Sequence, residues 1–280
     1  MTQIGSSAAE QIISVPGRPD AVISLAWGAA TDTGHKRSHN EDSFVAKAPI
    51  FAVADGMGGH SAGDVASAAV VTRLAEVISA DFTEADAVEQ GLRAATIDIS
   101  RAADEKELGV GTTVAGAALT LQGGDPYWMV FNVGDSRVYM FEQNELTQVS
   151  VDHSVVQELV DAGMIRAEDA ESHPDSNVIT RAVGFNAEPM PDYWMVPVRK
   201  ELRLLLCSDG LTKELDKERI RLHMAAGLAP SETAQALVDA ALAAGGRDNV
   251  TTIVVDVVDS TGAFDLDHTI PRGGQNPSSE

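Results

Sequence analysis

The chain has 280 residues, which is long enough for one large domain or two small ones with a sizeable buried core. Its 20 Lys and Arg residues against 42 Asp and Glu residues give a formal net charge of −22, and such a field disfavours nucleic acid and anionic membranes as partners. A single cysteine, Cys207, excludes an internal disulfide framework, and no apolar run approaches the roughly 20 residues that span a bilayer. The N-terminus also lacks a basic start followed by an apolar stretch, so we expect a cytoplasmic protein without membrane insertion.

The predicted elements follow a leader at residues 1–22 that shows no periodicity and that we expect to be loose. Strands are predicted where β-branched and aromatic residues lie between Gly, Pro or Asp: 23–31, 50–54, 112–121, 127–133, 136–142, 193–198, 202–207 and 250–258. Apolar residues that recur three and four apart predict helices at 62–80, 84–104 and 232–244, the last capped by Ser231. Strands in hairpin-like pairs, with two early helices and a late one, favour a single α+β domain at 23–258.

Two segments depart from this alternation. Residues 150–190 combine short helical pieces around "VVQELVDAG" and "AEDAE" with turn chemistry in "SHPDSN", which indicates an insertion that lies over the sheet. Residues 259–280 are polar and rich in Gly and Pro, so they cannot bury enough apolar surface to offset the entropy of ordering them. We expect a disordered tail there.

Carboxylates stand beside the ends of apolar strands in five separate segments: Glu41 and Asp42 in "RSHNED", Asp55, Asp135, Asp209 and Asp248. Any one of them alone is explained as a turn former or a helix cap. Five segments together favour convergence, and convergent carboxylates repel one another unless cations neutralise them. Oxygen ligands without Cys or paired His indicate Mg²⁺ or Mn²⁺, and a pair of such ions commonly hydrolyses phosphate esters. Arg37, in the same loop as Glu41, is either a forked donor for a phosphate or an ordinary surface arginine.

Seven motifs in chain order closely resemble the bacterial branch of the metal-dependent, type 2C protein phosphatases: "RSHNED", "VADGMGGH", "GTT", "NVGDSR", "DHS", "CSDGL" and "GRDNVT". The resemblance covers about residues 24–258. It implies a four-layer α-β-β-α sandwich of two mainly antiparallel sheets, with metal ions in a cleft at one end and residues 150–190 as a flap beside that cleft. It also implies hydrolysis of phosphoserine and phosphothreonine in proteins by metal-activated water that attacks phosphorus, in opposition to a bacterial Ser/Thr kinase.

The same resemblance implies six metal ligands: Glu41, Asp55, Gly56 through its carbonyl, Asp135, Asp209 and Asp248. Asp55 would bridge two Mn²⁺ or Mg²⁺ ions, with Asp209 and Asp248 completing the first. Glu41 and the Gly56 carbonyl would hold the second ion. Asp135 would help Asp209 to hold a weaker third.

Three further residues have implied roles in the reaction itself. Arg37 would grip the substrate phosphate, and Asp42 would accept a hydrogen bond from the reacting water. His60 is the candidate general acid, although in animal relatives that histidine directly follows the Asp–Gly pair, whereas here it lies four residues past Gly56. The chain departs from some relatives again at Lys213, where they have another aspartate for the third metal.

Two alternative functions remain open on these residues. One is a phosphatase for a small phosphorylated metabolite, and the other is a catalytically silent phosphoprotein-binding regulatory module. Loss of Asp55, Asp209 or Asp248 would have favoured the silent module, and all three are present. In the tail, Thr269 of "DLDHTIPR" is a candidate phosphorylation site for a phosphothreonine reader such as a forkhead-associated domain, against the simpler interpretation of an uninvolved polar tail.

Overall fold

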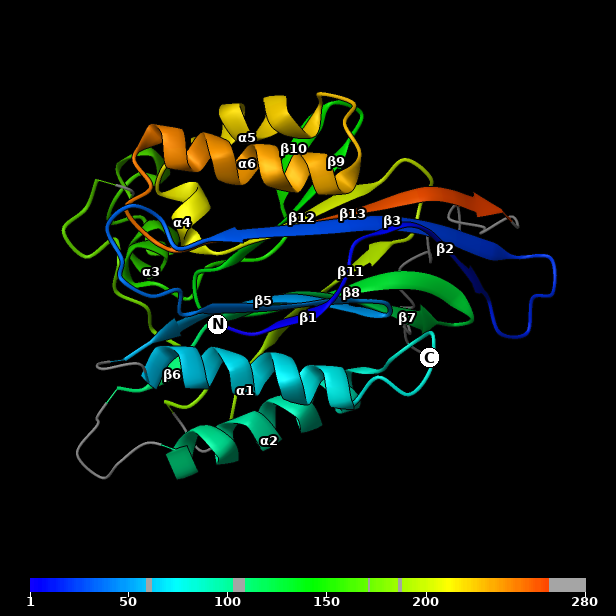
Figure 1. The fold of residues 1–280 in the computed structure, drawn as a ribbon, viewed down its shortest axis with the longest axis horizontal. Coiled ribbons are helices and arrows are strands. Elements are labelled where there is room, and N and C mark those ends of the chain that lie inside the picture. The colour runs from blue at the N-terminus through cyan, green and yellow to red at the C-terminus, as the bar shows by residue number, and fades with distance from the viewer. Residues whose placement is uncertain (59–61, 103–108, 171, 186–187, 262–280) are drawn as a thin grey trace, which may run out of the picture.

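The computed structural model describes residues 1–58, 62–102, 109–170, 172–185 and 188–261. Two sheets pack face to face, and helices cover the outer face of each (Figure 1). The first sheet has the order β1 (Gln3–Gly5), β4 (Asp42–Lys47), β5 (Ile50–Met57), β7 (Val114–Gln122), β8 (Asp125–Val133) and β11 (Asp192–Pro197), with β6 (Gly111–Thr112) paired to β5. The second has the order β10 (Glu145–Gln148), β9 (Arg137–Glu142), β12 (Arg203–Cys207), β13 (Val250–Thr261), β3 (Val22–Asp32) and β2 (Ala8–Ser14).

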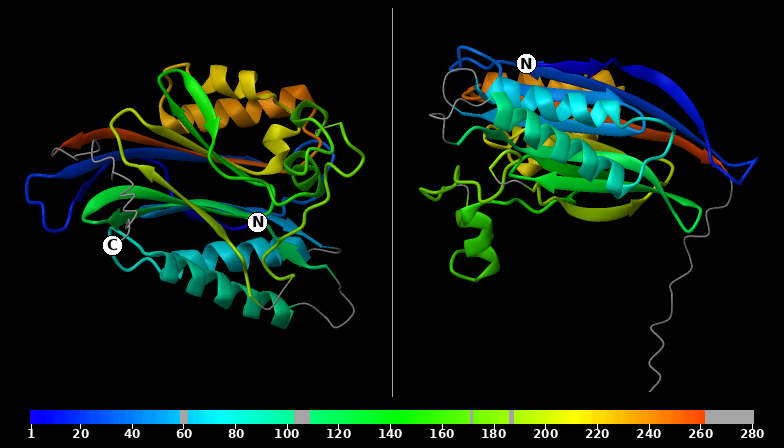
Figure 2. Two further views of the ribbon diagram at one scale, coloured as in Figure 1. Left: turned by 180° about the vertical axis from the view of Figure 1, so that it is seen from behind. Right: turned by 90° about the horizontal axis from the view of Figure 1, so that it is seen from below.

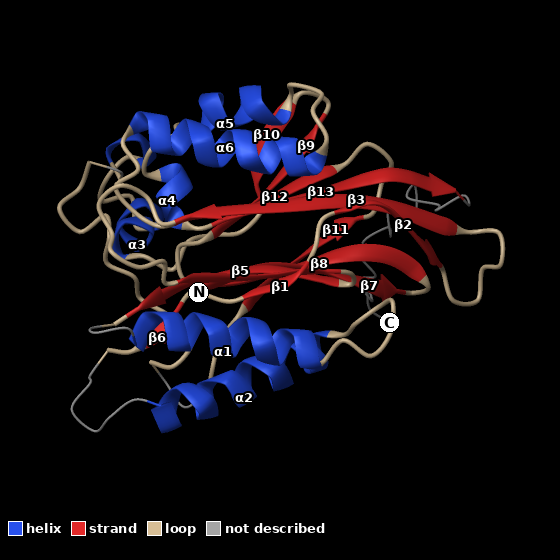
Figure 3. Ribbon diagram, in the orientation of Figure 1, coloured by secondary structure: helices blue, strands red, loops and turns tan. Residues whose placement is uncertain are grey.

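The helices complete a four-layer arrangement. The first sheet is covered by α1 (Ala62–Glu76) and α2 (Ala85–Ala102), and the second by α5 (Lys217–Met224) and α6 (Pro230–Ala244) (Figure 3). Nearly all strand pairs are antiparallel, the pair of β1 with β4 being parallel. The predicted α-β-β-α sandwich is therefore confirmed. Within the part of the chain that the structure describes, no helix is long and apolar enough to cross a membrane.

The apolar runs seen in the sequence become strands with both faces covered. Residues 50–54 of β5 are all buried, since one face of that strand meets α1 and the other meets the second sheet. A strand of this kind reads as a continuous apolar run rather than an alternating one. Between the sheets, Phe51 lies edge-on to Trp27 and Trp128, with ring centroids 5.3 and 6.0 Å away. Of these two edge-to-face contacts, the one between Phe51 and Trp27 joins the two sheets, and the one with Trp128 lies within the first sheet.

The prediction of a loose leader at 1–22 is wrong. In this segment β1 pairs with β4 and β2 pairs with β3, so the leader adds an edge strand to each sheet. Ser6, between them, accepts a hydrogen bond from Trp27 Nε1 at 2.9 Å. The apolar signal was too weak to see because an edge strand buries only some of its side chains: Ile13 is 1% exposed but Ile12 is 65% exposed.

Several element boundaries also differ from the predictions. Helix α6 begins at Pro230, and the Glu232 carboxylate accepts the Ala229 N–H in place of a cap by Ser231. Strands β4 and β10 and helix α5 were not predicted as elements. Strand β13 continues to Thr261, so the start of the predicted tail at 259 is three residues early, while the rest of the tail with Thr269 lies outside the described residues.

The segment at 150–190, called the flap segment below, contains α3 (Val155–Asp161) and a 3₁₀ turn at Ala167–Asp169. It lies at the end of the sandwich at which β5 ends, near α4 (Asp209–Thr212), in all the views of Figures 1 and 2. Two isolated bridges tie the chain there, one from Ser154 to Ile179 and one from Thr112 to Val183. The insertion therefore lies beside the end of both sheets.

Candidate active site

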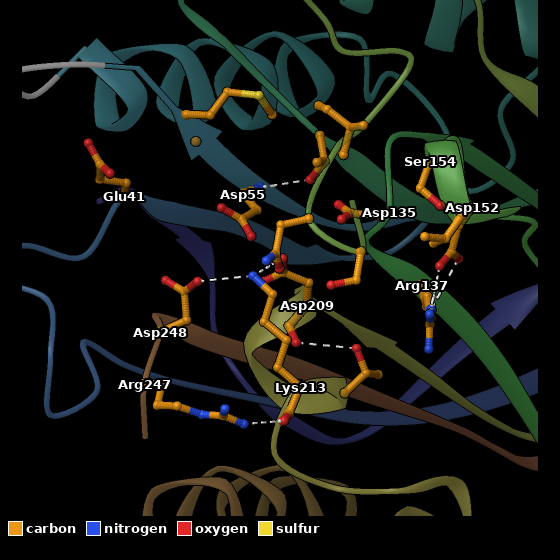
Figure 4. A pocket seen from close by; sticks show the side chains of 18 of the residues that line it. Glu41, Asp55, Asp135, Arg137, Asp152, Ser154, Asp209, Lys213, Arg247 and Asp248 are labelled. Carbon is orange, nitrogen blue, oxygen red and sulfur yellow. Dashed lines mark hydrogen bonds and ion pairs between the residues drawn. The ribbon is translucent and has the colours of Figure 1, made fainter. Parts of the chain in front are cut away.

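A cavity of about 820 Å³ opens at the end of the sandwich that carries α3 and α4 (Figure 4). It is lined by seven of the nine residues that the sequence singled out: Arg37, Glu41, Asp55, Gly56, Asp135, Asp209 and Asp248. Asp42 is fully buried and is absent from the lining. His60 lies outside the described residues. The strand-end carboxylates of both sheets thus meet in one place.

Asp42 connects the two sheets beneath this cavity. It is the register partner of Asp55 in the β4–β5 pair. Its Oδ2 accepts hydrogen bonds from Ser208 Oγ at 2.8 Å and Thr251 Oγ1 at 2.6 Å, both on the second sheet's side. Burial raises the pKa of Asp42 to about 7, and the two hydroxyl donors offset only part of that effect. Its Oδ1 has no hydrogen-bond partner among the described residues.

Asp55 comes from the end of β5 and is fixed through its backbone. Its N–H donates to Thr113 Oγ1 at 3.1 Å, and its carbonyl accepts from Thr113 N at 2.9 Å and Thr112 Oγ1 at 2.8 Å. The residues of "GTT" therefore position this aspartate. Burial raises the pKa of Asp55 well above its ordinary value, and the charges of Asp42, Asp209 and other nearby aspartates add to the effect.

Glycines let the start of α1 approach the end of β5. A Cβ on Gly56 would lie 2.0 Å from the Gly63 carbonyl oxygen, and one on Gly63 would lie 3.0 Å from Glu41 Oε1. The backbone of Gly56 and the side chain of Glu41 consequently face the same short stretch of chain. Any side chain at Gly56 would push the helix away from the carboxylates, which explains the glycine directly after Asp55.

Asn249 holds the loop that carries Arg37 and Glu41. Its Oδ1 accepts the Glu41 N–H at 2.8 Å, and its Nδ2 donates to the carbonyls of Thr33 and His39, each at 2.9 Å. Sequence reasoning did not single out this residue. The available signal was an asparagine directly after a strand-end aspartate in "GRDN", since an amide can donate and accept at once.

Asp135 lies between β8 and β9, where the chain passes from the first sheet to the second. Burial raises its pKa to about 7, and the charges of Asp209 and Asp152 add to this. The preceding turn is held by His153. Its ring Nδ1 accepts the Gly134 N–H at 3.1 Å, and its backbone N–H donates to the Gly134 carbonyl at 2.9 Å. The "DHS" motif thus fixes the turn that presents Asp135.

The same motif anchors the flap segment. Asp152 accepts two hydrogen bonds from Arg137 Nε, at 2.8 and 3.1 Å, and the Ser154 hydroxyl caps α3 by accepting the Gln157 N–H. These three residues were not predicted as part of the site. Ser154 and Arg137 nevertheless line the cavity, on the side away from Glu41 (Figure 4).

Two cationic side chains contact the carboxylates of the second sheet. Arg37 reaches Asp248 with both arms of its fork, Nε to Oδ1 at 2.9 Å and Nη2 to Oδ2 at 3.1 Å. Lys213 Nζ forms ion pairs with Asp209 and, at 3.2 Å, with Asp248 Oδ2. Asp209 itself is brought against β13 by Gly210, because a Cβ on that glycine would lie 1.9 Å from the Asn249 carbonyl oxygen.

The chemistry of this site fits hard divalent cations. Among the described residues no group of three carboxylate, His or Cys side chains is already arranged around one point, and the cationic Arg37 and Lys213 take up oxygens of Asp209 and Asp248. However, Asp209 Oδ1 is buried without a partner, and buried carboxylates from separate segments raise one another's pKa. Carboxylate oxygens that lie close together and repel one another are the ligands that Mg²⁺ and Mn²⁺ prefer.

Comparisons with known proteins point in one direction. Residues 31–244 match the family model described as protein phosphatase 2C. The serine/threonine phosphatase stp of Listeria welshimeri is 37% identical over 239 residues, which is 81% of this chain and 93% of that protein. The serine/threonine protein phosphatase PstP of Mycobacterium tuberculosis is 39% identical over 254 residues, 88% of this chain, and the chain spans only 47% of PstP.

Solved structures agree. The crystal structure of the M. tuberculosis phosphatase PstP/Ppp superposes with a TM-score of 0.75 at 36% identity, covering 85% of this chain and all of that one. The catalytic domain of PstP in complex with two manganese ions gives a TM-score of 0.73 at 36% identity, covering 85% of this chain and 99% of that one.

Proposed function

This chain belongs to the protein phosphatase 2C family and is a protein-serine/threonine phosphatase, and we propose that its strand-end carboxylates hold two Mn²⁺ or Mg²⁺ ions for that reaction. The observation that carries the proposal is the meeting of Glu41, Asp55, Asp209 and Asp248 in one cavity. These residues come from separate parts of the sequence, and ordinary solvation does not explain them, because burial and the charges of neighbouring aspartates raise the pKa of Asp55. The relative whose structure contains two manganese ions supports the choice of metal.

In this proposal each residue keeps the role that the motifs suggested. Asp55, Asp209 and Asp248 would hold the first ion, and Asp55 and Glu41 with the Gly56 carbonyl would hold the second. Asp135 and Asp209 offer a weaker third position. When bound, the ions supply positive charge that lowers the pKa of water and stabilises the phosphoryl oxygens in the transition state.

Two further residues act on water and substrate. Asp42 offers Oδ1, an acceptor without a partner among the described residues, to a water of the site. Arg37 is 49% exposed and uses Nε and Nη2 on Asp248, so its guanidinium retains donors for a phosphoryl oxygen. His60 stays the candidate general acid.

Arg37→Ala tests the substrate contact. Because the arginine binds the phosphate in both ground and transition states, the variant should raise KM several-fold on a phosphothreonine peptide and leave kcat nearly unchanged. The steady-state parameters of Lys36→Ala, which changes the exposed neighbouring cation, provide the matched control. A large fall in kcat at constant KM would contradict the role given to Arg37.

The preference for proteins over small metabolites is supported by the shape of the cavity. It continues from the carboxylates to Ser176, Asn177 and Ile179 of the flap segment, which leaves room for the chain around a phosphorylated residue. Comparing kcat/KM on phosphothreonine peptides with kcat/KM on sugar and nucleotide phosphates tests this. A higher value on the small phosphates would favour the metabolite phosphatase, and no turnover at any pH with Mn²⁺ would favour the silent module.

We also propose that the enzyme opposes a Ser/Thr kinase in the cytoplasm, and that neither nucleic acid nor a membrane is its partner. The net charge of −22 supports the second point. Thr269 remains the candidate contact for a phosphothreonine reader. Mass spectrometry of the protein from its native cells tests that contact, and consistently unmodified Thr269 would exclude it.

A further inference from the structure

Lys213 occupies an unusual position for a cation in a site built to bind cations. It is the C-cap of α4, four residues after Asp209, and one helical turn brings both side chains to the same face. Its Nζ contacts Asp209 Oδ2 and also lies 3.2 Å from Asp248 Oδ2 (Figure 4). One ammonium group therefore joins the two carboxylates that α4 and the start of β13 bring to the cavity.

The contacts of this ammonium are with the carboxylates themselves, since Lys213 Nζ forms an ion pair with each of Asp209 and Asp248. Its side chain is 32% exposed and lines the cavity, so a solute cation can reach the same oxygens. Lys213 also attracts Asp135 across the site, although burial dominates the pKa of that carboxyl.

We infer that Lys213 is a built-in counter-cation that holds Asp209 and Asp248 together in the metal-free enzyme and competes with the divalent ion for them. The inference rests on the proposed function, in which these two aspartates are ligands of the first ion. Metal binding then has to draw the two carboxylates away from an ion pair. Lys213 thereby stabilises the empty site and weakens the affinity of the occupied one.

Lys213→Gln separates this role from a merely structural one, because it should move two measured quantities in opposite directions. In excess chelator, the Tm of the variant should be lower than that of the wild type, since Asp209 then loses its ion pair with Lys213 and Asp248 keeps only the one with Arg37. In calorimetric titration with Mn²⁺, the Kd of the site should fall by about tenfold, because one competing unit charge has been removed from beside its ligands. A structural defect would lower the Tm and weaken metal binding together.

Arg247→Gln is the matched control. Arg247 lines the same cavity, but its side chain pairs with Glu214 at 2.8 Å and donates to the Lys213 carbonyl at 2.7 Å, and it forms no ion pair with a strand-end aspartate among the described residues. Its loss removes the same charge from the cavity without freeing a proposed ligand. The inference would be overturned, and the proposed function left intact, if the Kd for Mn²⁺ in Lys213→Gln were unchanged or higher than in the wild type. An equal fall of the Kd in Arg247→Gln would overturn it as well. Failure of the wild-type protein to bind Mn²⁺ would overturn both.

Discussion

The two sheets deliver their carboxylates to the site under different electrostatic conditions. On the second sheet's side, Asp209 and Asp248 stand in ion pairs with Lys213 and Arg37. On the first sheet's side, Asp42 is fully buried and Asp55 is partly buried, and within the described residues neither forms an ion pair with a cationic side chain. One half of the site therefore carries its own positive charge, and in the proposed function the other half would receive it from cations in solution.

The two halves differ in how well the fold stabilises their ionised carboxylates when no metal is bound. Burial raises the pKa of Asp55, and raises that of Asp42 to about 7, so the first-sheet half is strained by charge when it is ionised. Asp42 is partly relieved by two hydroxyl donors from across the sandwich. In the proposed function a bound divalent ion would offset this charge at Asp55, and metal affinity would then depend on the protonation of this half.

The largest expected effect is on kcat, in two single variants that each remove one carboxylate, one from each half of the site. Asp55→Asn and Asp248→Asn should each lower kcat on a phosphothreonine peptide by at least ~10²–10³, because each removes a charge worth a few kcal/mol in the transition state. Circular dichroism should show both variants folded. Near-normal turnover in either variant would remove that residue from the site.

In excess chelator, the same two variants should shift the Tm in opposite directions relative to the wild type. Asp55→Asn removes a carboxyl whose ionisation is disfavoured by burial and by neighbouring aspartates, and it should raise the Tm by a few degrees, at roughly 2–4 °C per kcal/mol for a domain of this size. Asp248→Asn leaves Arg37 and Lys213 without a shared partner and should lower it. Thermal unfolding by calorimetry measures both, and shifts of the same sign would abolish the distinction between the two halves.

The pH dependence of stability gives a smaller effect of the same origin. The native pKa of Asp42 and of Asp135 is about 7, above the value of roughly 4 for an unfolded aspartate. Between these values the native state binds more protons than the unfolded state, so the free energy of unfolding should fall as pH rises from about 4 to about 7.

With Mn²⁺ present, this trend should weaken or reverse, because the metal binds ionised carboxylates. The measurement is the Tm of the wild type at pH 5 and pH 8, with chelator and with Mn²⁺. Asp135→Asn in chelator should show a shallower slope than the wild type. Equal slopes with and without metal would contradict the coupling of metal to the buried carboxyls.

The smallest effect is expected from shortening the chain. Because Asp259, Ser260 and Thr261 pair with β3, a chain ending at Thr261 keeps the whole of β13. We expect it to retain kcat and KM, since the cavity is lined by residues far from that end. Loss of metal-dependent activity by a shortened chain that is still folded would assign the tail a part in catalysis.

Much of this architecture was predictable from the sequence because its strands are buried on both faces. Runs such as "IFAVA" can be recognised without their neighbours, and the carboxylates that follow them were predicted to converge. Strand β2 could not be recognised in that way, since it is stabilised by pairing to β3 and buries few side chains. Edge strands depend on a sheet that only the fold supplies.

The electrostatic pairing within the site was less predictable. Asp209 and Lys213 are visible as an i,i+4 pair in "DGLTK", but the contact with Asp248 joins residues 35 positions apart. The hydroxyls of Ser208 and Thr251 that hold Asp42 are separated from it by 166 and 209 positions. No local pattern specifies such partners, because they are determined by the register of two packed sheets.

One measurement tests the central claim, that these carboxylates work through divalent ions, most directly. The enzyme is stripped of metal, removal is verified by elemental analysis, and hydrolysis of a phosphothreonine peptide is followed in excess chelator and then after Mn²⁺ addition. We predict no turnover above background in chelator and full recovery with Mn²⁺, because the carboxylates that meet in the cavity are proposed to act by holding divalent ions that activate water. Robust hydrolysis by the verified metal-free enzyme would contradict the account.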